Sequence, residues 1–260
     1  MGRIEERYNE TVELKRNFDN NPNDLDLYSL YDIVIADVED LEKMKSLSDE
    51  ELEKLEEKYR KSKASFFKKI AEYGKEKGLP TREVEFEYWH YCVDLSNNQE
   101  LLRIGETKKI QLKAYIKLSS EFMGNDIIRE NYFKALEELV KYGMDEEIIT
   151  GLKMPTEFEE YLSRKDGCIF YFNENILKNG KDVLFFRKMN EILEKYELRD
   201  KVKITHGYDL YTSERVGHSY SQLIADRILK IKTRILHAKL EDVIKYAENE
   251  LFEICVIGLN

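Results

Sequence analysis

Residues 198–208 read LRDKVKITHGY. Whether this segment is a strand or the end of a helix decides between two possible folds for the last third of the chain. Val202 and Ile204 alternate with lysine and threonine, which is typical of a β-strand. A short apolar run precedes this segment at residues 168–172, and a helical pattern lies between the two. This interpretation predicts a small β-α-β unit. The alternative is that residues 198–208 are the end of a helix, which would leave the chain almost entirely α-helical.

Most of the chain before residue 168 has helical periodicity. Ser48 with Glu51, and Thr156 with Glu159, have the spacing of capping boxes, in which each side chain satisfies an amide at the start of a helix. The patterns predict helices at residues 2–18, 24–41, 48–77, 98–104, 106–123, 126–142, 145–152 and 157–165.

Two further segments have distinctive patterns. Residues 82–93 alternate apolar and acidic side chains around Val84 and Phe86, which suggests a strand, although the aromatic residues also fit a buried helix. Residues 219–253 contain neither Gly nor Pro and repeat apolar residues every three or four positions. We therefore expect one long helix there, with a possible break near His237.

These patterns predict a mainly α-helical fold, α or α+β, with helical hairpins, a few strands in the C-terminal third and a long C-terminal helix. Residues 1–155 form a helical scaffold region, and residues 156–260 form a C-terminal region with the short strands and the long helix. No Gly/Ser linker separates the two, so they can form one continuous domain. A chain of 260 residues, of which 42% are hydrophobic, is long enough for a substantial core.

The net charge of −10 predicts an acidic surface that repels nucleic acid, so a nucleic-acid-binding protein would need a local basic face. Residues 199–238 carry eight basic and four acidic side chains. Within this segment, Arg227, Lys230 and Arg234 share one helix face, and Arg215 lies nearby. These four residues are candidates for binding a phosphate backbone. The other interpretation is an ordinary solvated helix face.

The three cysteines, Cys92, Cys168 and Cys255, are far apart and form no CxxC motif. We therefore expect no disulfide framework and no zinc site, and a cytoplasmic location. No apolar stretch is long enough to span a membrane, and the charged N-terminus does not have the pattern of a secretory signal. No carboxylate spacing supports a metal at His206 and His218, and no glycine-rich phosphate-binding motif occurs, so no cofactor is expected.

The candidate catalytic residues are Arg199, Asp200, His206 and Tyr208. A histidine with a pKa near neutrality can transfer a proton during RNA cleavage, with the 2′-hydroxyl of the RNA as the attacking group. An arginine can stabilise the extra negative charge that develops on the phosphate. Asp200 can orient either side chain. Such chemistry requires no protein nucleophile and no metal.

At these residues the chain resembles the HEPN family (higher eukaryotes and prokaryotes nucleotide-binding). That family has an Arg that is often followed by Asn or Asp, and then a His in a His-x-Tyr context. Here Arg199-Asp200 and His206-Gly207-Tyr208 match this pattern, with six residues between Arg199 and His206. The resemblance implies an α-helical, metal-independent endoribonuclease, in which two copies of the motif meet at a dimer interface, often in a defence or toxin system.

The alternative function is a non-catalytic interaction or regulatory protein. The helix at Ile224–Ile235 has an apolar seam that could dock a partner helix or a second copy of the chain. Geometry distinguishes the two functions, because the ribonuclease requires Arg199 and His206 to converge. In a regular strand their side chains would lie on opposite faces, roughly 20 Å apart.

Overall fold

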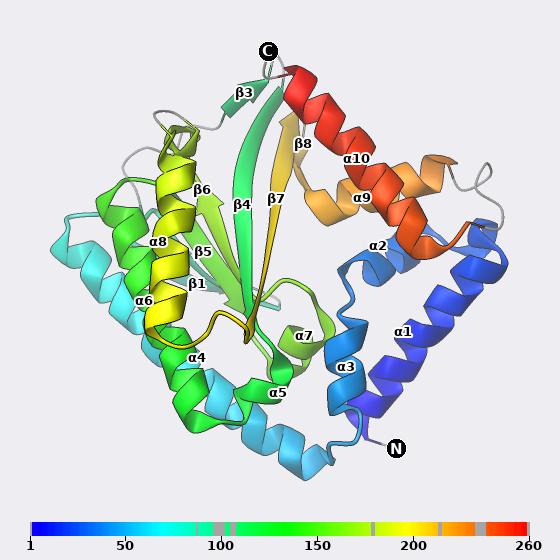
Figure 1. The fold of residues 1–260 in the computed structure, drawn as a ribbon, viewed down its shortest axis with the longest axis horizontal. Helices are drawn as coiled ribbons and strands as arrows, with labels where there is room; N and C mark the ends of the chain where they lie inside the picture. The colour runs from blue at the N-terminus through cyan, green and yellow to red at the C-terminus, as the bar shows by residue number, and fades with distance from the viewer. Residues whose placement is uncertain are drawn as a thin grey trace.

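The computed structural model describes residues 2–86, 88–95, 102–104, 108–177, 180–212, 215–231 and 238–258 (Figure 1). At its centre is an eight-stranded sheet with the order β1-β2-β5-β6-β4-β7-β8, in which β3 also pairs with β4. All of these pairs are antiparallel. The strands are β1 Arg82–Phe86, β2 Trp89–Val93, β3 Leu102–Ile104, β4 Lys108–Leu118, β5 Ile149–Pro155, β6 Cys168–Phe172, β7 Val202–Thr212 and β8 Arg215–Ser219.

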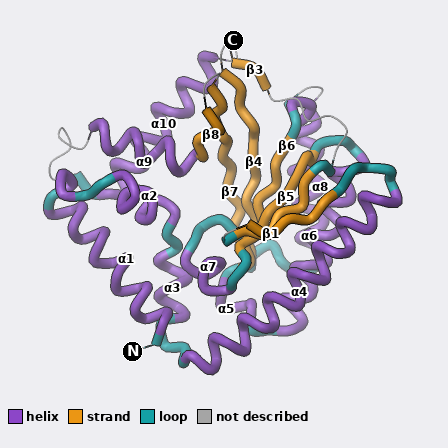
Figure 2. Tube along the Cα trace, turned by 180° about the vertical axis from the view of Figure 1, so that it is seen from behind, coloured by secondary structure: helices purple, strands orange, loops and turns teal. Residues whose placement is uncertain are grey.

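The helices form two groups, one packed on a face of the sheet and one beyond an edge of it. Helices α4, α6 and α8 lie along one face, whereas α1, α2, α9 and α10 lie beyond the edge that β7 and β8 form (Figures 1 and 2). The helices are α1 Arg3–Asn20, α2 Leu27–Ile35, α3 Val38–Met44, α4 Asp49–Glu76, α5 Ser120–Met123, α6 Asp126–Asp145, α7 Phe158–Ser163, α8 Lys181–Lys195, α9 Tyr220–Ile231 and α10 Leu240–Gly258, with 3-10 turns η1 Pro22–Asp24 and η2 Glu174–Ile176.

The fold is therefore mixed α+β, one of the two predicted classes, but the strands are not confined to the C-terminal third, where the prediction placed them. Strands β1 to β5 all precede residue 156. The predicted boundary between residues 155 and 156 falls between β5 and β6, which are hydrogen-bonded neighbours in the sheet. The described strands on the two sides of that boundary thus belong to a single sheet.

The largest error concerns residues 106–123, where a helix was predicted and the long strand β4 is found. The sequence alternates through β4: Ala114, Ile116 and Leu118 are buried in the main core, and Lys113 and Lys117 occupy alternate positions on the other face of the strand. This two-residue period is the strand signal. Lysine and glutamine also favour helices, which hid the signal, and pairing with β6 and β7 decided the conformation.

Other ambiguous segments also became strands. Residues 82–86 and 89–93 form the hairpin β1–β2. The helix predicted at residues 145–152 is not found, because α6 ends at Asp145 and β5 begins at Ile149. Of the two alternatives that the sequence left open for the segment around residues 168–208, the structure has the β-α-β unit, as β6-α8-β7. Both strands of this unit are antiparallel to β4, so they run parallel to each other with β4 between them.

One of the two capping boxes is confirmed. The Ser48 hydroxyl accepts from the Glu51 amide, and the Glu51 carboxylate accepts from the Ser48 amide, at the start of α4. The box predicted at Thr156 was wrong, because α7 begins at Phe158 with Glu157 as its N-cap residue.

The main hydrophobic core lies between the sheet and helices α4, α6, α7 and α8. Three fully buried tyrosines cross this core and satisfy their hydroxyls on backbone carbonyls. Tyr59 donates to the Pro155 carbonyl at 2.8 Å, Tyr132 donates to a carbonyl of β4 at 2.8 Å, and Tyr161 donates to another carbonyl of β4 at 2.9 Å. These bonds tie the helices to specific positions along the strands.

A second, smaller core is formed by α1, α2, α9 and α10. The segment predicted as one long helix with a possible break near His237 contains two helices: α9 ends at Ile231 and α10 begins at Leu240. His237 itself lies outside the described residues. Ile224, Ile228 and Ile231 are buried in this core, so within the described residues the predicted docking seam packs against the chain itself. Ile235 lies outside the described residues.

A buried ion cluster fastens α3 to the sheet. The Lys117 ammonium on β4 lies 2.8 Å from the Asp37 carboxylate and 2.8 Å from the Asp40 carboxylate. Lys203 on β7 lies 3.0 Å from Asp37 and 2.9 Å from Asp40. Two ammonium groups thus balance two buried carboxylates, which buried charges require.

Candidate functional site

The structure separates the residues of the predicted ribonuclease motif. Arg199 and Asp200 lie exposed in the turn between α8 and β7. His206 lies four residues into β7, roughly 13 Å along the strand from Val202 at a rise of about 3.3 Å per residue. Its ring packs edge-on against Phe186 of α8, with ring centroids 4.7 Å apart. One chain therefore does not bring Arg199 and His206 together.

The rest of the motif has structural roles in β7. Tyr208 is buried and lies opposite Leu112 of β4. Gly207 lies under the ring of Tyr115, because a Cβ atom at position 207 would be only 2.7 Å from the Tyr115 hydroxyl oxygen. The glycine in the sequence element is thus explained by a close approach between neighbouring strands.

The predicted nucleic-acid-binding residues lie on two elements. Arg215 belongs to β8, Arg227 and Lys230 belong to α9, and Arg234 lies outside the described residues. Lys230 is exposed and Arg227 is partly buried. Phosphate binding by this group stays a prediction.

A different set of residues gathers on the sheet face opposite the main core. The strands alternate, so the side chains between the core residues of β2, β4, β5, β6 and β7 share this face. A loop that precedes β6 adds an arginine and an aspartate. We call this set the lysine–aromatic face, and it consists of Trp89, Tyr91, Lys113, Lys153, Arg164, Asp166, Tyr171 and Asp209.

Lys153 is at the centre of this face, among aromatic rings. Its ammonium nitrogen lies 4.1 Å from the ring centre of Trp89, 5.5 Å from that of Tyr91 and 5.8 Å from that of Tyr171. No carboxylate of the described residues lies within salt-bridge distance of it. Burial, and next the positive charge of Lys113, lower the pKa of Lys153 from 10.5 to about 8, against the opposing effect of Asp166 and Asp209.

Lys113 and Asp209 form a buried pair on the floor of the face. The ammonium nitrogen of Lys113 lies 2.5 Å from one Asp209 oxygen and 4.6 Å from the ring centre of Tyr171. Burial lowers the pKa of Lys113 despite the Asp209 charge. The second oxygen of Asp209 is buried and has no hydrogen-bond partner among the described groups. A buried acceptor of this kind is suited to a donor on a bound molecule or water.

Arg164 and Asp166 form the rim. The Arg164 guanidinium donates to the Asp166 carboxylate at 2.8 Å and lies 4.8 Å from the ring centre of Trp89. Burial would raise the pKa of Asp166, but the adjacent Arg164 charge prevails and holds it below the usual value. Arg164 and Lys113 therefore have carboxylate partners, whereas Lys153 contributes the unmatched positive charge of the face.

Sequence reasoning missed this face because its members are far apart, from residue 89 to residue 209. The available signal was the alternation in β4, where the lysines and Tyr115 occupy the positions between core residues. Lysines at alternate positions of a buried strand would have indicated a polar sheet face.

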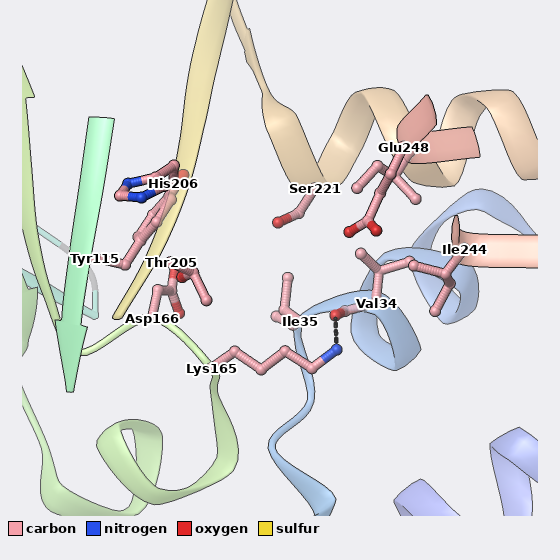
Figure 3. A pocket seen from close by; sticks show the side chains of 11 residues that line it. Val34, Ile35, Tyr115, Lys165, Asp166, Thr205, His206, Ser221, Ile244 and Glu248 are labelled. Atoms are coloured by element: carbon pink, nitrogen blue, oxygen red, sulfur yellow. Dashed lines mark hydrogen bonds between the residues drawn. The ribbon is translucent and has the colours of Figure 1, made fainter. Parts of the chain in front are cut away.

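A cavity of about 120 Å³ lies beside the β7 edge, next to the lysine–aromatic face. Figure 3 shows Tyr115, Asp166 and His206 on the sheet side of this cavity and Ser221 and Glu248 on the helix side. Burial lowers the pKa of His206. His206 therefore remains mainly neutral at pH 7.

Comparisons with known proteins place the chain near few others. No family model matches it, and no curated protein matches it. Two solved structures are similar. The effector protein from Pseudomonas syringae pv. tomato strain DC3000 is 10% identical over 87% of this chain and 88% of that chain, with a TM-score of 0.44. The effector protein from Pseudomonas syringae pv. syringae strain 61 is 12% identical over 95% of this chain and 91% of that chain, with a TM-score of 0.44.

Within the described residues, no group of three or more His, Cys, Asp or Glu side chains has the arrangement of a metal site. In the same part of the chain, none of the helices combines the length and apolar character needed to cross a membrane. At the similarity found, neither effector structure assigns a function to this chain.

Proposed function

We propose that the chain is an enzyme that uses the amine of Lys153 for proton transfer on an anionic substrate. The observation that carries the proposal is a partly exposed lysine in an aromatic surround, with no carboxylate partner among the described residues and with two further cations on the same face. Burial lowers the pKa of Lys63 to about 8 as well, but Lys63 donates to the Pro155 and Thr156 carbonyls in the core. Lys153 combines the lowered pKa with a partly exposed position beside further cations, which is the arrangement of active-site lysines.

The pKa of about 8 makes Lys153 suitable as a general base. At pH 7 about a tenth of the amine is uncharged, and at pH 8 about half. An uncharged Lys153 can abstract a proton from a carbon or oxygen atom of the substrate. Negative charge that develops on the substrate would be stabilised by Arg164 and Lys113, since both are held in place by their carboxylate partners.

The substrate class follows from the charge and the rings. When Lys153 is protonated, the face carries three cations, Lys113, Lys153 and Arg164, against the carboxylates of Asp166 and Asp209, and this net positive charge favours a substrate with a phosphate or carboxylate group. The rings of Trp89, Tyr91 and Tyr171 would pack against the remainder of the molecule. Binding of the anion raises the pKa of Lys153, so the anion must lie closer to Arg164 and Lys113 than to the amine for the base to remain uncharged.

The proposal is tested by acylating the native protein with acetic anhydride from pH 6 to pH 10 and measuring each lysine-containing peptide by mass spectrometry. The Lys153 rate is expected to level off above pH about 8, because only the neutral amine reacts. Inorganic phosphate should slow acylation of Lys153 and leave the exposed Lys61 unchanged. An acylation rate of Lys153 that still rises steeply at pH 10, or that does not change when phosphate is added, would contradict the proposal.

The metal-independent ribonuclease stays a prediction, and it now requires two chains to bring Arg199 and His206 together. Its test is cleavage of mixed-sequence single-stranded RNA in EDTA by the wild type, Arg199→Ala, His206→Ala and Lys153→Met. Cleavage that is lost in the first two variants would support the motif. Cleavage that is lost only in Lys153→Met would assign RNA as the anionic substrate of the lysine–aromatic face.

A further inference from the structure

The cavity beside β7 shares Asp166 with the lysine–aromatic face, but Lys153 itself does not line it. β7 pairs with β4 along its whole length, but β8 joins β7 only from Asp209 onward. The part of β7 before Asp209 is thus an edge, and the cavity lies between this edge and helices α2, α9 and α10. We call it the edge pocket. Its lining is Val34, Ile35, Tyr115, Lys165, Asp166, Thr205, His206, Ser221, Ile224, Ile244 and Glu248.

We propose that the edge pocket binds a small organic ammonium ion, whose charge pairs with the Glu248 carboxylate and whose apolar part packs against the isoleucines and valine of the lining. The inference does not depend on the function proposed for Lys153.

The charges of the lining support a cationic ligand. Asp166 is already paired with Arg164. The Lys165 ammonium donates to the Val34 carbonyl at 3.0 Å, near the C-terminal end of α2 (Figure 3). No cation of the described residues lies within salt-bridge distance of Glu248. Lys165 retains its charge and opposes the raised pKa of Glu248, but within the described residues the two form no salt bridge. Glu248 is therefore the carboxylate of this pocket that a ligand cation can approach directly.

Burial supports the same conclusion. Glu248 is partly buried, and burial raises its pKa above 4.5 although Lys165 and Lys245 oppose the shift. A half-buried carboxylate without a direct partner carries a desolvation cost, which a ligand cation would remove. The Ser221 hydroxyl also points into the cavity and can accept from the same ammonium group (Figure 3).

The size of the cavity limits the ligand. A cavity of about 150 Å³ holds one benzene molecule, so the edge pocket at about 120 Å³ suits on the order of five non-hydrogen atoms. Ile224 and Ile244 come from α9 and α10, and Val34 and Ile35 come from α2. A bound ligand would thus contact the helices of the second core and the sheet at once, and would raise the stability of their junction.

The test measures binding of n-butylammonium by NMR titration of the ¹⁵N-labelled chain, with 1-butanol and butyrate as probes of equal length but different charge. Resonances of α9, α10 and β7 are expected to shift with n-butylammonium, and 1-butanol should bind at least about tenfold more weakly. Equal affinity for n-butylammonium and 1-butanol would overturn the proposal. The absence of any shift with n-butylammonium at concentrations of about 0.1 M would overturn it as well.

Glu248→Gln should weaken n-butylammonium binding at least about tenfold, whereas the matched variant Glu241→Gln, exposed on the same helix, should bind like the wild type. Lowering the pH should weaken binding as Glu248 is protonated. Other charged or titratable groups near Glu248 could also change with pH, namely Asp166, His206, Lys165 and Lys245. The pH dependence of binding is therefore compared with that of Glu248→Gln, which lacks the Glu248 carboxyl group. If Glu248→Gln does not fold, Ser221→Leu provides a second variant, because its larger side chain occupies the pocket and should abolish binding.

Discussion

At the scale of single residues, Gly207 shows how a catalytic-looking motif can contain a steric requirement. The glycine leaves room for the Tyr115 ring on the adjacent strand. Gly207→Ala is expected to destabilise the fold by about 1–3 kcal/mol, because the ring must move out of a packed position. Urea unfolding measures this change.

A double-mutant cycle isolates the cause. In a Tyr115→Ala background the cost of Gly207→Ala should fall below about 1 kcal/mol, because the atom that the new methyl group would strike is gone. The same cost in both backgrounds would show that the strand geometry at residue 207, rather than Tyr115, requires glycine.

Burial also determines the reactivity of two cysteine thiols. Cys92 and Cys168 are buried, and burial raises the pKa of both thiols, that of Cys92 to about 12. Because the thiolate is the reactive form, neither residue should react with iodoacetamide in the native protein at pH 8. Both should react in urea. Mass spectrometry of the alkylated peptides gives the result, and rapid native labelling of Cys168 would show that its strand opens readily.

At the scale of secondary-structure elements, the ion cluster determines how α3 meets the sheet. Lys117 has no exposed side-chain surface, whereas Lys203 is 30% exposed. Lys117→Met leaves two buried carboxylates poorly compensated and should cost about 3–5 kcal/mol. Lys203→Met should cost about 1 kcal/mol, because water can replace part of its contact. The free energies of unfolding are measured in urea. A larger loss of stability in Lys203→Met than in Lys117→Met would contradict this ranking.

The same cluster makes stability depend on acid. Burial opposes ionisation of Asp37, but Lys117 and Lys203 prevail and lower the pKa of Asp37 below 3.8 in the folded chain. Ionised Asp37 therefore stabilises the fold above pH about 4, and this contribution is lost as the pH falls through the lowered folded value. Asp37→Asn should remove this part of the dependence between pH 5 and pH 2, whereas the exposed Glu53→Gln should not, as followed by circular dichroism.

At the scale of the whole molecule, two cores share one chain. The first helices pack with the last helices, so the second core closes only when both ends of the chain have folded. Ile228→Ala should cost about 2–5 kcal/mol, because Ile228 is fully buried in this core. The exposed Ile127→Ala should change stability by less than about 0.5 kcal/mol.

Hydrogen exchange distinguishes a local effect from a global one. Ile228→Ala should raise exchange in α2, α9 and α10 before it raises exchange in α4 and α6, because the two cores are separate clusters. A uniform increase across all helices would show that the two cores unfold as one unit.

Local signals in the sequence determined many of the elements. The Ser48 capping box and the helix α6 were predicted because their periodicity and end signals lie within a few residues of each other. The β6-α8-β7 unit was one of two alternatives that the same local signals allowed. The strand β4 was missed because its residues have helix propensity as well as a strand period. Its conformation depends on hydrogen bonds to β6 and β7, which are more than 50 residues away in the chain.

The candidate site depended on tertiary structure almost completely. Sequence reasoning chose Arg199 and His206 because they are near each other in the chain, but an extended strand holds them apart. Lys153, Trp89 and Asp209 are far apart in the chain, and the order of strands in the sheet brings them to one face. The charge of an amine depends on what surrounds it, so the pKa of Lys153 is a property of the assembled face and not of any local segment.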